Sequence, residues 1–130
     1  MNLIFDTVVL IDIQNRKSET IERLKELSEI YTGPGQITFM TYFEFLFGLG
    51  EKSLKNKEIA IAFINNFECL QTTKTTAEIL SNLKRKYEKI GKSLSLTDFL
   101  IAAQVIENNG TLITRDKDFA RIEELKKIFI

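Results

Sequence analysis

The chain has 130 residues, of which 44% are hydrophobic and 28% charged, and its 18 basic and 18 acidic side chains give a net charge of zero. That size predicts one domain with its own core, spanning residues 1–130. A neutral balance gives no overall attraction to a polyanion, so nucleic-acid binding would need local basic patches or bound cations. The chain has no histidine and one cysteine, Cys69, which excludes a Ser-His-Asp triad and a thiolate zinc cluster.

The sequence also predicts the cellular compartment of the protein. It has no run of about 18 apolar residues and no N-terminal signal pattern, so we expect no membrane segment. A single cysteine cannot form an internal disulfide, which agrees with a reducing, cytoplasmic environment.

Hydrophobic periodicity predicts short strands that alternate with helices. The elements expected first are a strand at 2–6, a helix at 18–30, a turn at 32–36, a strand at 36–39 and helices at 41–50 and 57–67. Those expected next are a strand at 69–73, an amphipathic helix at 75–90, a buried helix at 98–107, and strands at 110–114 and 127–130. This alternation predicts an α/β fold, a parallel sheet with helices on both faces, whose ligands bind at the carboxyl ends of the strands.

Four acids fall where predicted strands end or the following helices begin. Asp6 ends the first strand, and Glu44 lies in the first turn of the helix that follows the second strand. Asp98 lies in the first turn of the buried helix, and Asp116 comes just after the strand at 110–114. Because these positions share one edge of a doubly wound sheet, we expect the four carboxylates to lie together.

Each acid also has a structural explanation. Thr41 and Glu44 fit a capping box worth about 1 kcal/mol. Asp98 fits a helix dipole after a Thr97 cap, worth roughly 0.3–1 kcal/mol, and the other two acids fit turns or N-caps. However, two carboxylates about 5 Å apart repel by roughly 3 kcal/mol at an effective dielectric near 20. Gathering four of them costs more than capping recovers unless cations neutralise the charge.

The donor set indicates which cation this would be. Oxygen ligands without nitrogen or sulfur favour a hard divalent ion, Mg²⁺ or Mn²⁺. Such ions activate water and neutralise charge on a phosphodiester, so the acids predict phosphodiester hydrolysis. The apolar run behind Asp98 would hold this ligand rigidly in the core.

Three segments of the chain resemble the PIN-domain ribonucleases, and most closely the VapC-like toxins of type II toxin–antitoxin pairs. FDTVVLID at 5–12 is similar to the opening motif of that family, and TYFEFLFGL at 41–49 is similar to its acid-bearing helix with a downstream glycine. IGKSLSLTDFLIAAQVIENNGTLITRDKDFARI at 90–122 is similar to its closing block, the most specific of the three. The resemblance covers most of the chain, and residues 50–80 contribute little to it.

The resemblance implies a PIN-like parallel sheet flanked by helices and an endoribonuclease that requires Mg²⁺ or Mn²⁺. It also implies a homodimer and inhibition by a cognate antitoxin protein. By position, Asp6, Glu44, Asp98 and Asp116 would be the metal-binding and catalytic acids. The chain departs from the family at Val8, where Asn or Ser is frequent, and this puts a polar contact there in doubt.

Other residues of these motifs take supporting roles by the same resemblance. Thr7 would be a polar neighbour of the first acid, and Thr114 would orient Asp116 or a water molecule. Arg115 and Lys117 are candidate RNA contacts, with a solvated loop as the alternative. Asp118 is expected to be structural, as a cap of the turn at DFARI, with direct metal ligation as the alternative.

Exposed and apolar surfaces on the helices have two readings each. Lys84, Arg85 and Lys86 are expected on the solvated face of the amphipathic helix, with RNA contact as the alternative. Phe43, Phe45 and Phe47 fit either the core or an interface. The apolar segment 59–64 fits a dimer or antitoxin groove, or a plain core helix.

Two other functions stay open, and the sequence argues against a third. A housekeeping RNA-processing nuclease would share the fold and the acids, and an adjacent antitoxin gene would decide between it and a toxin. A catalytically silent PIN-like binding module would bind metal without cleaving RNA. A haloacid-dehalogenase-like phosphatase needs a second aspartate two residues after the first, but Thr7 and Val8 follow Asp6.

Overall fold

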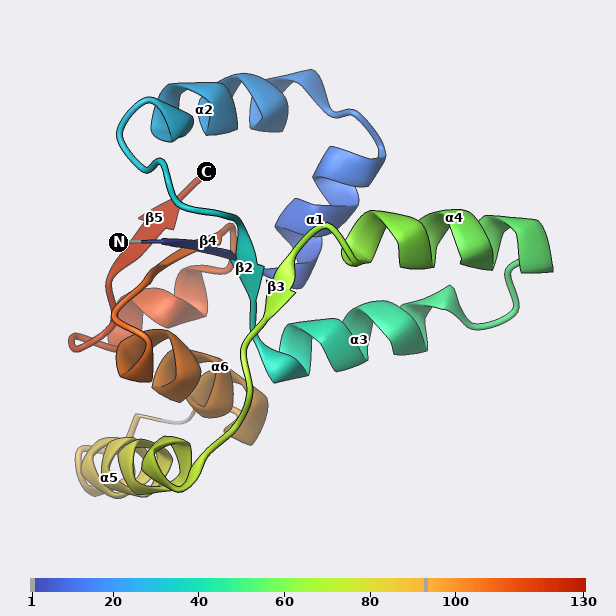
Figure 1. The fold of residues 1–130 in the computed structure, drawn as a ribbon. Helices are drawn as coiled ribbons and strands as arrows, with labels where there is room; N and C mark the ends of the chain where they lie inside the picture. Colours follow the sequence, from blue (N-terminus) through green and yellow to red (C-terminus); the bar gives the residue numbers. More distant parts are fainter. Residues whose placement is uncertain (1, 93) are drawn as a thin grey trace.

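A parallel β-sheet forms the centre of the fold (Figure 1). The computed structural model describes residues 2–92 and 94–130, and within them five strands lie in the order β3-β2-β1-β4-β5, with every neighbouring pair parallel. The strands are β1 (Leu3–Phe5), β2 (Gln36–Ile37), β3 (Glu68–Cys69), β4 (Thr111–Thr114) and β5 (Lys127–Phe129). The predicted α/β fold with a parallel sheet is confirmed.

Helices connect the strands and cover both faces of the sheet. They are α1 (Thr7–Gln14), α2 (Ser18–Ser28), α3 (Phe39–Leu49), α4 (Leu54–Ile64), α5 (Lys74–Lys89), α6 (Leu96–Glu107) and a 3₁₀ helix, η1 (Lys117–Arg121). Helices α5 and α6 pack together on one side of the sheet, while α3 and α4 project side by side on the other (Figure 1).

Helix α1 was not expected from the sequence. Its residues Val8, Val9 and Ile11 favour a strand when they are considered locally, because β-branched side chains suit a sheet better than a helix. Asp6 stops β1 instead, since its carboxylate accepts a hydrogen bond from the backbone N–H of Thr7 at 2.9 Å and caps the new helix. Strands β2 and β3 are also shorter than the predicted 36–39 and 69–73, because α3 begins at Phe39 and the chain leaves β3 after Cys69.

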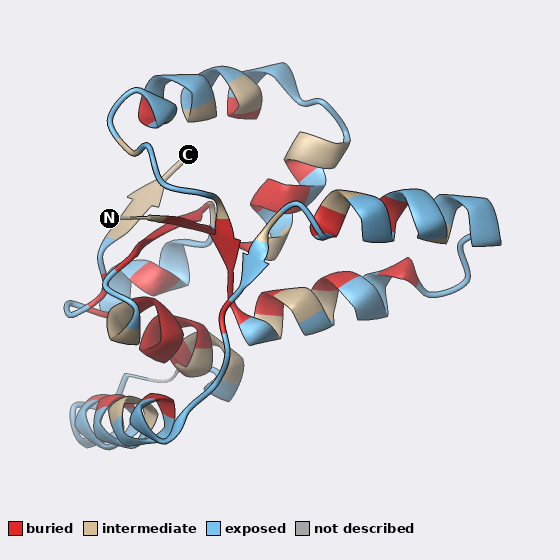
Figure 2. Ribbon diagram, in the orientation of Figure 1, coloured by how far each residue is buried: buried red, intermediate tan, exposed pale blue. Residues whose placement is uncertain are grey.

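The core consists of two clusters, one on each face of the sheet. Alternate residues of β1 separate them, because Ile4 packs with α5 and α6 while Leu3 and Phe5 pack with α1 to α4. The same division occurs in β4, where Leu112 belongs to the first cluster and Ile113 to the second. Figure 2 shows the central strands and inner helix faces buried. Each fully buried aliphatic side chain contributes about 1.5–3 kcal/mol.

Helix α5 is amphipathic, as predicted, and Lys84, Arg85 and Lys86 are exposed. Ile90, expected on the inner face, lies just beyond the end of the helix and is 57% exposed. At 16 residues α5 is the longest of the described helices, and none of them combines the length and the apolar character that a bilayer-spanning helix requires.

A buried glutamine joins the two sides of the fold. Gln104, in α6, is completely buried, and its Oε1 accepts a hydrogen bond from the backbone N–H of Phe39 at 2.8 Å. Its Nε2 donates to the carbonyl of Leu70 at 3.2 Å. The side chain therefore fixes the start of α3, and the segment after β3, relative to α6.

We expect Gln104→Leu to lower the free energy of unfolding by about 1–3 kcal/mol, because the partly buried N–H of Phe39 and the carbonyl of Leu70 lose the side chain to which they are hydrogen-bonded. Urea unfolding would measure this effect. Gln71→Leu, at an exposed position, is the matched control and should change stability by no more than about 0.5 kcal/mol. Equal stability of the two variants would contradict the role of Gln104.

Candidate metal centre

Asp6 is fixed at the junction of β1 and α1. Besides the Thr7 N–H, which donates to Oδ1, the hydroxyl of Thr114 donates to Oδ2 at 2.7 Å. Thr114 ends β4, is completely buried, and is brought beside Asp6 by the pairing of Phe5 with Ile113. Asp6 is itself only 8% exposed, so strand pairing and two hydrogen bonds determine where its carboxylate lies.

Glu44 reaches the same place from α3. The hydroxyl of Thr7 donates to Glu44 Oε1 at 3.1 Å and thereby links α1 to α3. Helix α3 begins earlier than expected, at Phe39, and its cap is Thr38, whose hydroxyl accepts from the Thr41 N–H at 3.1 Å. The expected capping box of Thr41 and Glu44 is therefore wrong. Glu44 lies in the second turn, and its hydrogen bond is to Thr7.

Asp98 is held at the start of α6. Ser95 caps this helix, rather than Thr97, since its hydroxyl accepts from the Asp98 N–H at 3.1 Å. The residues after Asp98 are nearly all buried, from Phe99 to Val105. Asp98, half-buried, is thus fixed to an element that cannot shift without disturbing the core.

Two more acids follow β4. The N–H of Asp116 donates to the Thr114 hydroxyl at 3.0 Å, and its Oδ1 accepts from the Asp118 N–H at 2.9 Å. The cap of η1 is therefore Asp116, and the expected capping role of Asp118 is wrong. Carboxylate oxygens of Asp98, Asp116 and Asp118 lie within 4.8 Å of one another. The tight turn of η1 returns Asp118 to the cluster, which the linear motif did not indicate.

The hydroxyl of Thr114 links two of these acids by hydrogen bonds. Its hydroxyl donates to Asp6 and accepts from the backbone of Asp116, so one buried side chain positions an acid after β1 and another after β4. The predicted link of Thr114 to Asp116 is present, but it runs through the backbone N–H.

The acids share one electrostatic environment. Burial raises the pKa of Asp6, and the charge of Asp116 raises it further, against the hydrogen bonds from the two threonines. Burial likewise raises the pKa of Glu44, with added repulsion from Asp6 and Asp98. The pKa of Asp98 is raised by burial and by the charges of Asp116, Asp118 and Asp6. A divalent cation would relieve this repulsion, and the donors, all carboxylate oxygens, fit Mg²⁺ or Mn²⁺.

The two predicted RNA contacts have partners outside the acid cluster. Arg115 donates from Nη2 to Asp12 Oδ1 at 3.2 Å, and the buried Asp12 also accepts from the Thr20 hydroxyl at 2.8 Å. The ammonium of Lys117 lies 4.3 Å from the ring centroid of Phe129, in cation–π contact. The sequence did not single out Asp12, whose partners are 8 and 103 residues away.

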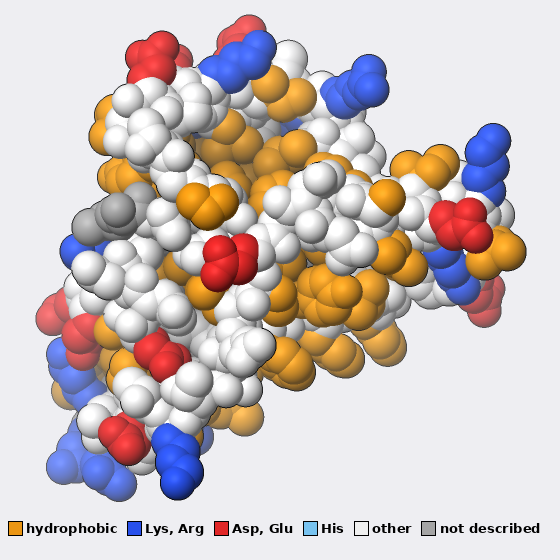
Figure 3. Space-filling view, in the orientation of Figure 1, with side chains coloured by type: hydrophobic (Ala, Val, Ile, Leu, Met, Phe, Trp, Pro, Cys, Tyr) orange, Lys and Arg blue, Asp and Glu red, His pale blue; other side chains and the backbone are white. Residues whose placement is uncertain are grey.

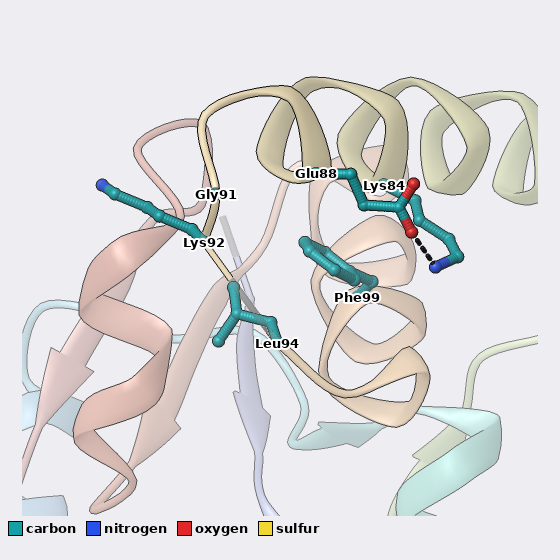
Figure 4. Close-up of a pocket in the computed structure, with 6 residues that line it drawn as sticks. All are labelled: Lys84, Glu88, Gly91, Lys92, Leu94 and Phe99. Atoms are coloured by element: carbon teal, nitrogen blue, oxygen red, sulfur yellow. Dashed lines mark hydrogen bonds and ion pairs between the residues drawn. The ribbon is translucent and has the colours of Figure 1, made fainter.

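A separate pocket of about 320 Å³ lies between the end of α5 and the start of α6 (Figure 4). Lys84 and Glu88 form an ion pair across one side of it. Its lining consists of Lys84, Glu88, Gly91, Lys92, Leu94 and Phe99. None of the five acids Asp6, Glu44, Asp98, Asp116 and Asp118 lines this pocket, so it is distinct from the candidate metal centre.

Comparison with known proteins places this geometry in a family. The family model for the PIN domain matches residues 3–125. A search of curated protein sequences gives no match.

Solved structures with the same fold come from several bacteria. A chain of VapBC2 from Rickettsia felis, crystallised with a DNA fragment from the promoter, has a TM-score of 0.85 and 20% identity, covering 100% of this chain and 99% of that chain. VapBC-1 from nontypeable Haemophilus influenzae has a TM-score of 0.82 and 21% identity, and the match covers 99% of this chain and 98% of that chain. A toxin–antitoxin complex from Klebsiella pneumoniae has a TM-score of 0.72 and 26% identity, and the match covers 95% of this chain and 94% of that chain.

The raised pKa values predict how pH affects the metal-free protein. A folded acid with a raised pKa keeps a proton that the unfolded chain has released, so its stabilising contribution is present at low pH and is lost as the pH rises through the raised value. In EDTA, Asp98→Asn should therefore gain stability relative to wild type as the pH rises from about 4 to about 7. Urea unfolding across that range would measure the difference. A constant difference, or one that moves in favour of wild type, would contradict the raised pKa of Asp98.

Proposed function

The chain belongs to the PIN-domain family, and on that premise we propose that it is a metal-dependent endoribonuclease, the toxin of a toxin–antitoxin pair. The observation that carries the proposal is the convergence of Asp6, Glu44, Asp98 and Asp116 at the carboxyl ends of β1 and β4. Burial, together with repulsion among these acids, raises the pKa of three of them. Such clustering is unfavourable for the apo fold and favourable for holding a cation against a phosphodiester.

Mg²⁺ or Mn²⁺ held by these acids would supply two effects, a lower pKa for a bound water molecule and neutralisation of charge on the phosphate. Asp98, Asp116 and Asp118 offer carboxylate oxygens close enough to share one ion. Each carboxylate oxygen of Asp6 accepts one hydrogen bond, from Thr7 or from Thr114, and has a second lone pair that could bind a metal ion.

The two threonines act as positioning residues. Thr114 holds Asp6 and the backbone of Asp116, while Thr7 holds Asp6 through its N–H and Glu44 through its hydroxyl. Each hydrogen bond restricts a carboxylate to one orientation, so little ordering is left to occur when the substrate binds. Arg115 and Lys117 stay candidate RNA contacts on the loop that carries Asp116.

Protein partners would bind the apolar surface of α3 and α4. Figure 3 shows hydrophobic side chains gathered over these two helices. The exposed members are Phe39, Phe43, Leu46 and Phe47 on α3, and Leu54, Ile59 and Ile61 on α4. In segment 59–64, Ala60 and Ile64 are buried, so this helix contributes to the core on one face and to a surface on the other. Exposed apolar area of this kind is typical of protein interfaces.

Two partners are proposed for that surface, a cognate antitoxin and a second copy of the chain. The similar solved structure from Klebsiella pneumoniae, which is described as a toxin–antitoxin complex, supports the first. The homodimer, the cytoplasmic location and the extent of the domain over residues 1–130 stay predictions. A housekeeping nuclease or a silent binding module would share the same acids. A cleavage assay distinguishes the silent module from a nuclease, because the module would bind metal without cleaving RNA.

Asp98→Asn should keep the fold and reduce metal-dependent RNA cleavage by more than about 100-fold. Loss of a residue that only supports a metal ligand typically costs about 10–100-fold, and Asp98 is proposed as a ligand itself. The substitution removes charge at nearly constant shape. Cleavage of a mixed RNA pool would be measured with Mg²⁺, with Mn²⁺ and with EDTA. Glu29→Gln, an exposed acid in the loop after α2, is the control and should cleave like wild type. Wild-type cleavage by Asp98→Asn would exclude the acid cluster as the active site.

Asp118→Asn tests whether this fifth acid binds the ion. Its place beside Asp98 and Asp116 predicts that Mn²⁺ affinity falls about tenfold or more, by isothermal titration calorimetry. The backbone N–H that donates to Asp116 is retained, so η1 keeps its cap. Affinity equal to that of wild type would leave Asp118 with a structural role alone.

A further inference from the structure

A small pocket of about 140 Å³ lies between α1 and α3, next to the candidate metal centre. Thr7 and Glu44 belong to both, since they line the pocket and are hydrogen-bonded to each other beside Asp6. The pocket follows one stripe of α1, through Ile11, and continues the acid cluster along the groove between the helices.

The walls combine apolar surface with unused amide groups. Phe45 and Leu49 form a buried apolar floor, at 5% and 7% exposure, and Ile11 lies opposite on α1. Gln14 and Asn15 line the end of α1, and within residues 2–92 and 94–130 neither side-chain amide forms a hydrogen bond. Apolar walls with free donors and acceptors at one edge suit a planar heterocycle.

Gly48 keeps this pocket open. It lies in the last turn of α3, four residues after Glu44, and a Cβ atom built on it meets nothing within 4 Å. Its backbone is helical, so neither a positive φ nor a close packing contact requires glycine here. Glycine in a helix is less favourable than alanine by up to about 1 kcal/mol. What the missing side chain of Gly48 does provide is open space in the wall of the pocket.

We propose that this pocket binds one unpaired base of the RNA substrate and thereby gives cleavage its sequence preference. The inference rests on the proposed nuclease function. Proteins read single-stranded RNA by splaying a base against apolar or aromatic surface and hydrogen-bonding its edge, for which Gln14 and Asn15 supply donors and acceptors. Lys52, exposed and also lining the pocket, supplies positive charge for the adjoining phosphate.

The position and size of the pocket favour a base over other occupants. Because Glu44 is shared with the acid cluster, a base in the pocket belongs to a nucleotide adjacent to the phosphodiester at the metal centre. A volume of about 140 Å³ admits one planar ring system and is too small for the helix of a protein partner.

Gly48→Leu tests the proposal by filling the open space without touching an acid. Ala77→Leu, which adds the same kind of side chain at an exposed position of α5, is the matched control. Cleavage sites would be mapped in a pool of random single-stranded RNA oligonucleotides with Mn²⁺. Wild type and the control should share a base preference next to the cut, and Gly48→Leu should weaken that preference about tenfold or more. Mn²⁺ affinity should be equal in all three proteins.

A binding measurement gives an answer independent of cleavage. Adenosine, guanosine, cytidine and uridine would be titrated into each protein in EDTA while the side-chain NH₂ signals of Gln14 and Asn15 are followed by NMR. At least one nucleoside should shift these signals in wild type and in Ala77→Leu, and none should do so in Gly48→Leu.

The outcomes separate the pocket from the nuclease function. Signals that no nucleoside shifts, or a cleavage preference that Gly48→Leu leaves unchanged, would overturn the base pocket while the nuclease stands. Nucleoside binding by a wild-type protein that cleaves no RNA would overturn the nuclease and retain the base site. Weaker binding of a cognate antitoxin by Gly48→Leu, with an unchanged cleavage preference, would assign the pocket to a protein partner.

Discussion

The hydrogen bond from Thr114 to Asp6, at 2.7 Å, joins the ends of the two central strands, and the rest of the site depends on it. It exists because β1 and β4 pair in parallel with Phe5 opposite Ile113, which leaves the next residues side by side at the edge of the sheet. The same hydroxyl accepts the Asp116 N–H, so the segment that carries Asp116 and Asp118 is placed relative to Asp6. A shift of one residue in the register would move Thr114 to the other face.

Packing compensates for the repulsion at this edge. Two carboxylates about 5 Å apart repel by roughly 3 kcal/mol, which is comparable to the contribution of one or two fully buried aliphatic side chains. Helix α6 supplies several such side chains directly behind Asp98, and Ile4 and Leu112 supply more in the strands. The core can therefore hold acids together that would separate in a flexible loop. Rigid placement and raised pKa values are two results of the same burial.

The surfaces around the acids have different characters, which suggests a division of roles. Helices α3 and α4 expose large apolar side chains on the projecting part of the fold (Figure 3). The groove between α1 and α3 is small, partly polar and continuous with the acids through Glu44. Helix α3 contributes to both, because Glu44, Phe45 and Gly48 line the groove while Phe43 and Phe47 stack outside it with ring centroids 5.9 Å apart. A protein bound on α3 would thus lie close to the acid cluster.

The sequence by itself determined the alternation of strands and helices, the parallel sheet, and the placement of four acids at one edge. These follow from local periodicity and from the chain order of strand ends, which any parallel α/β sheet brings together. Only the tertiary structure decided that residues 7–14 form a helix, that Thr38 and Ser95 are the caps, and that Asp118 returns to the acid cluster. It also decided the pairing of Arg115 with Asp12 and the groove beside Gly48. These features depend on contacts between residues far apart in the chain, whose geometry is set when helices pack against the sheet and which local propensity does not encode.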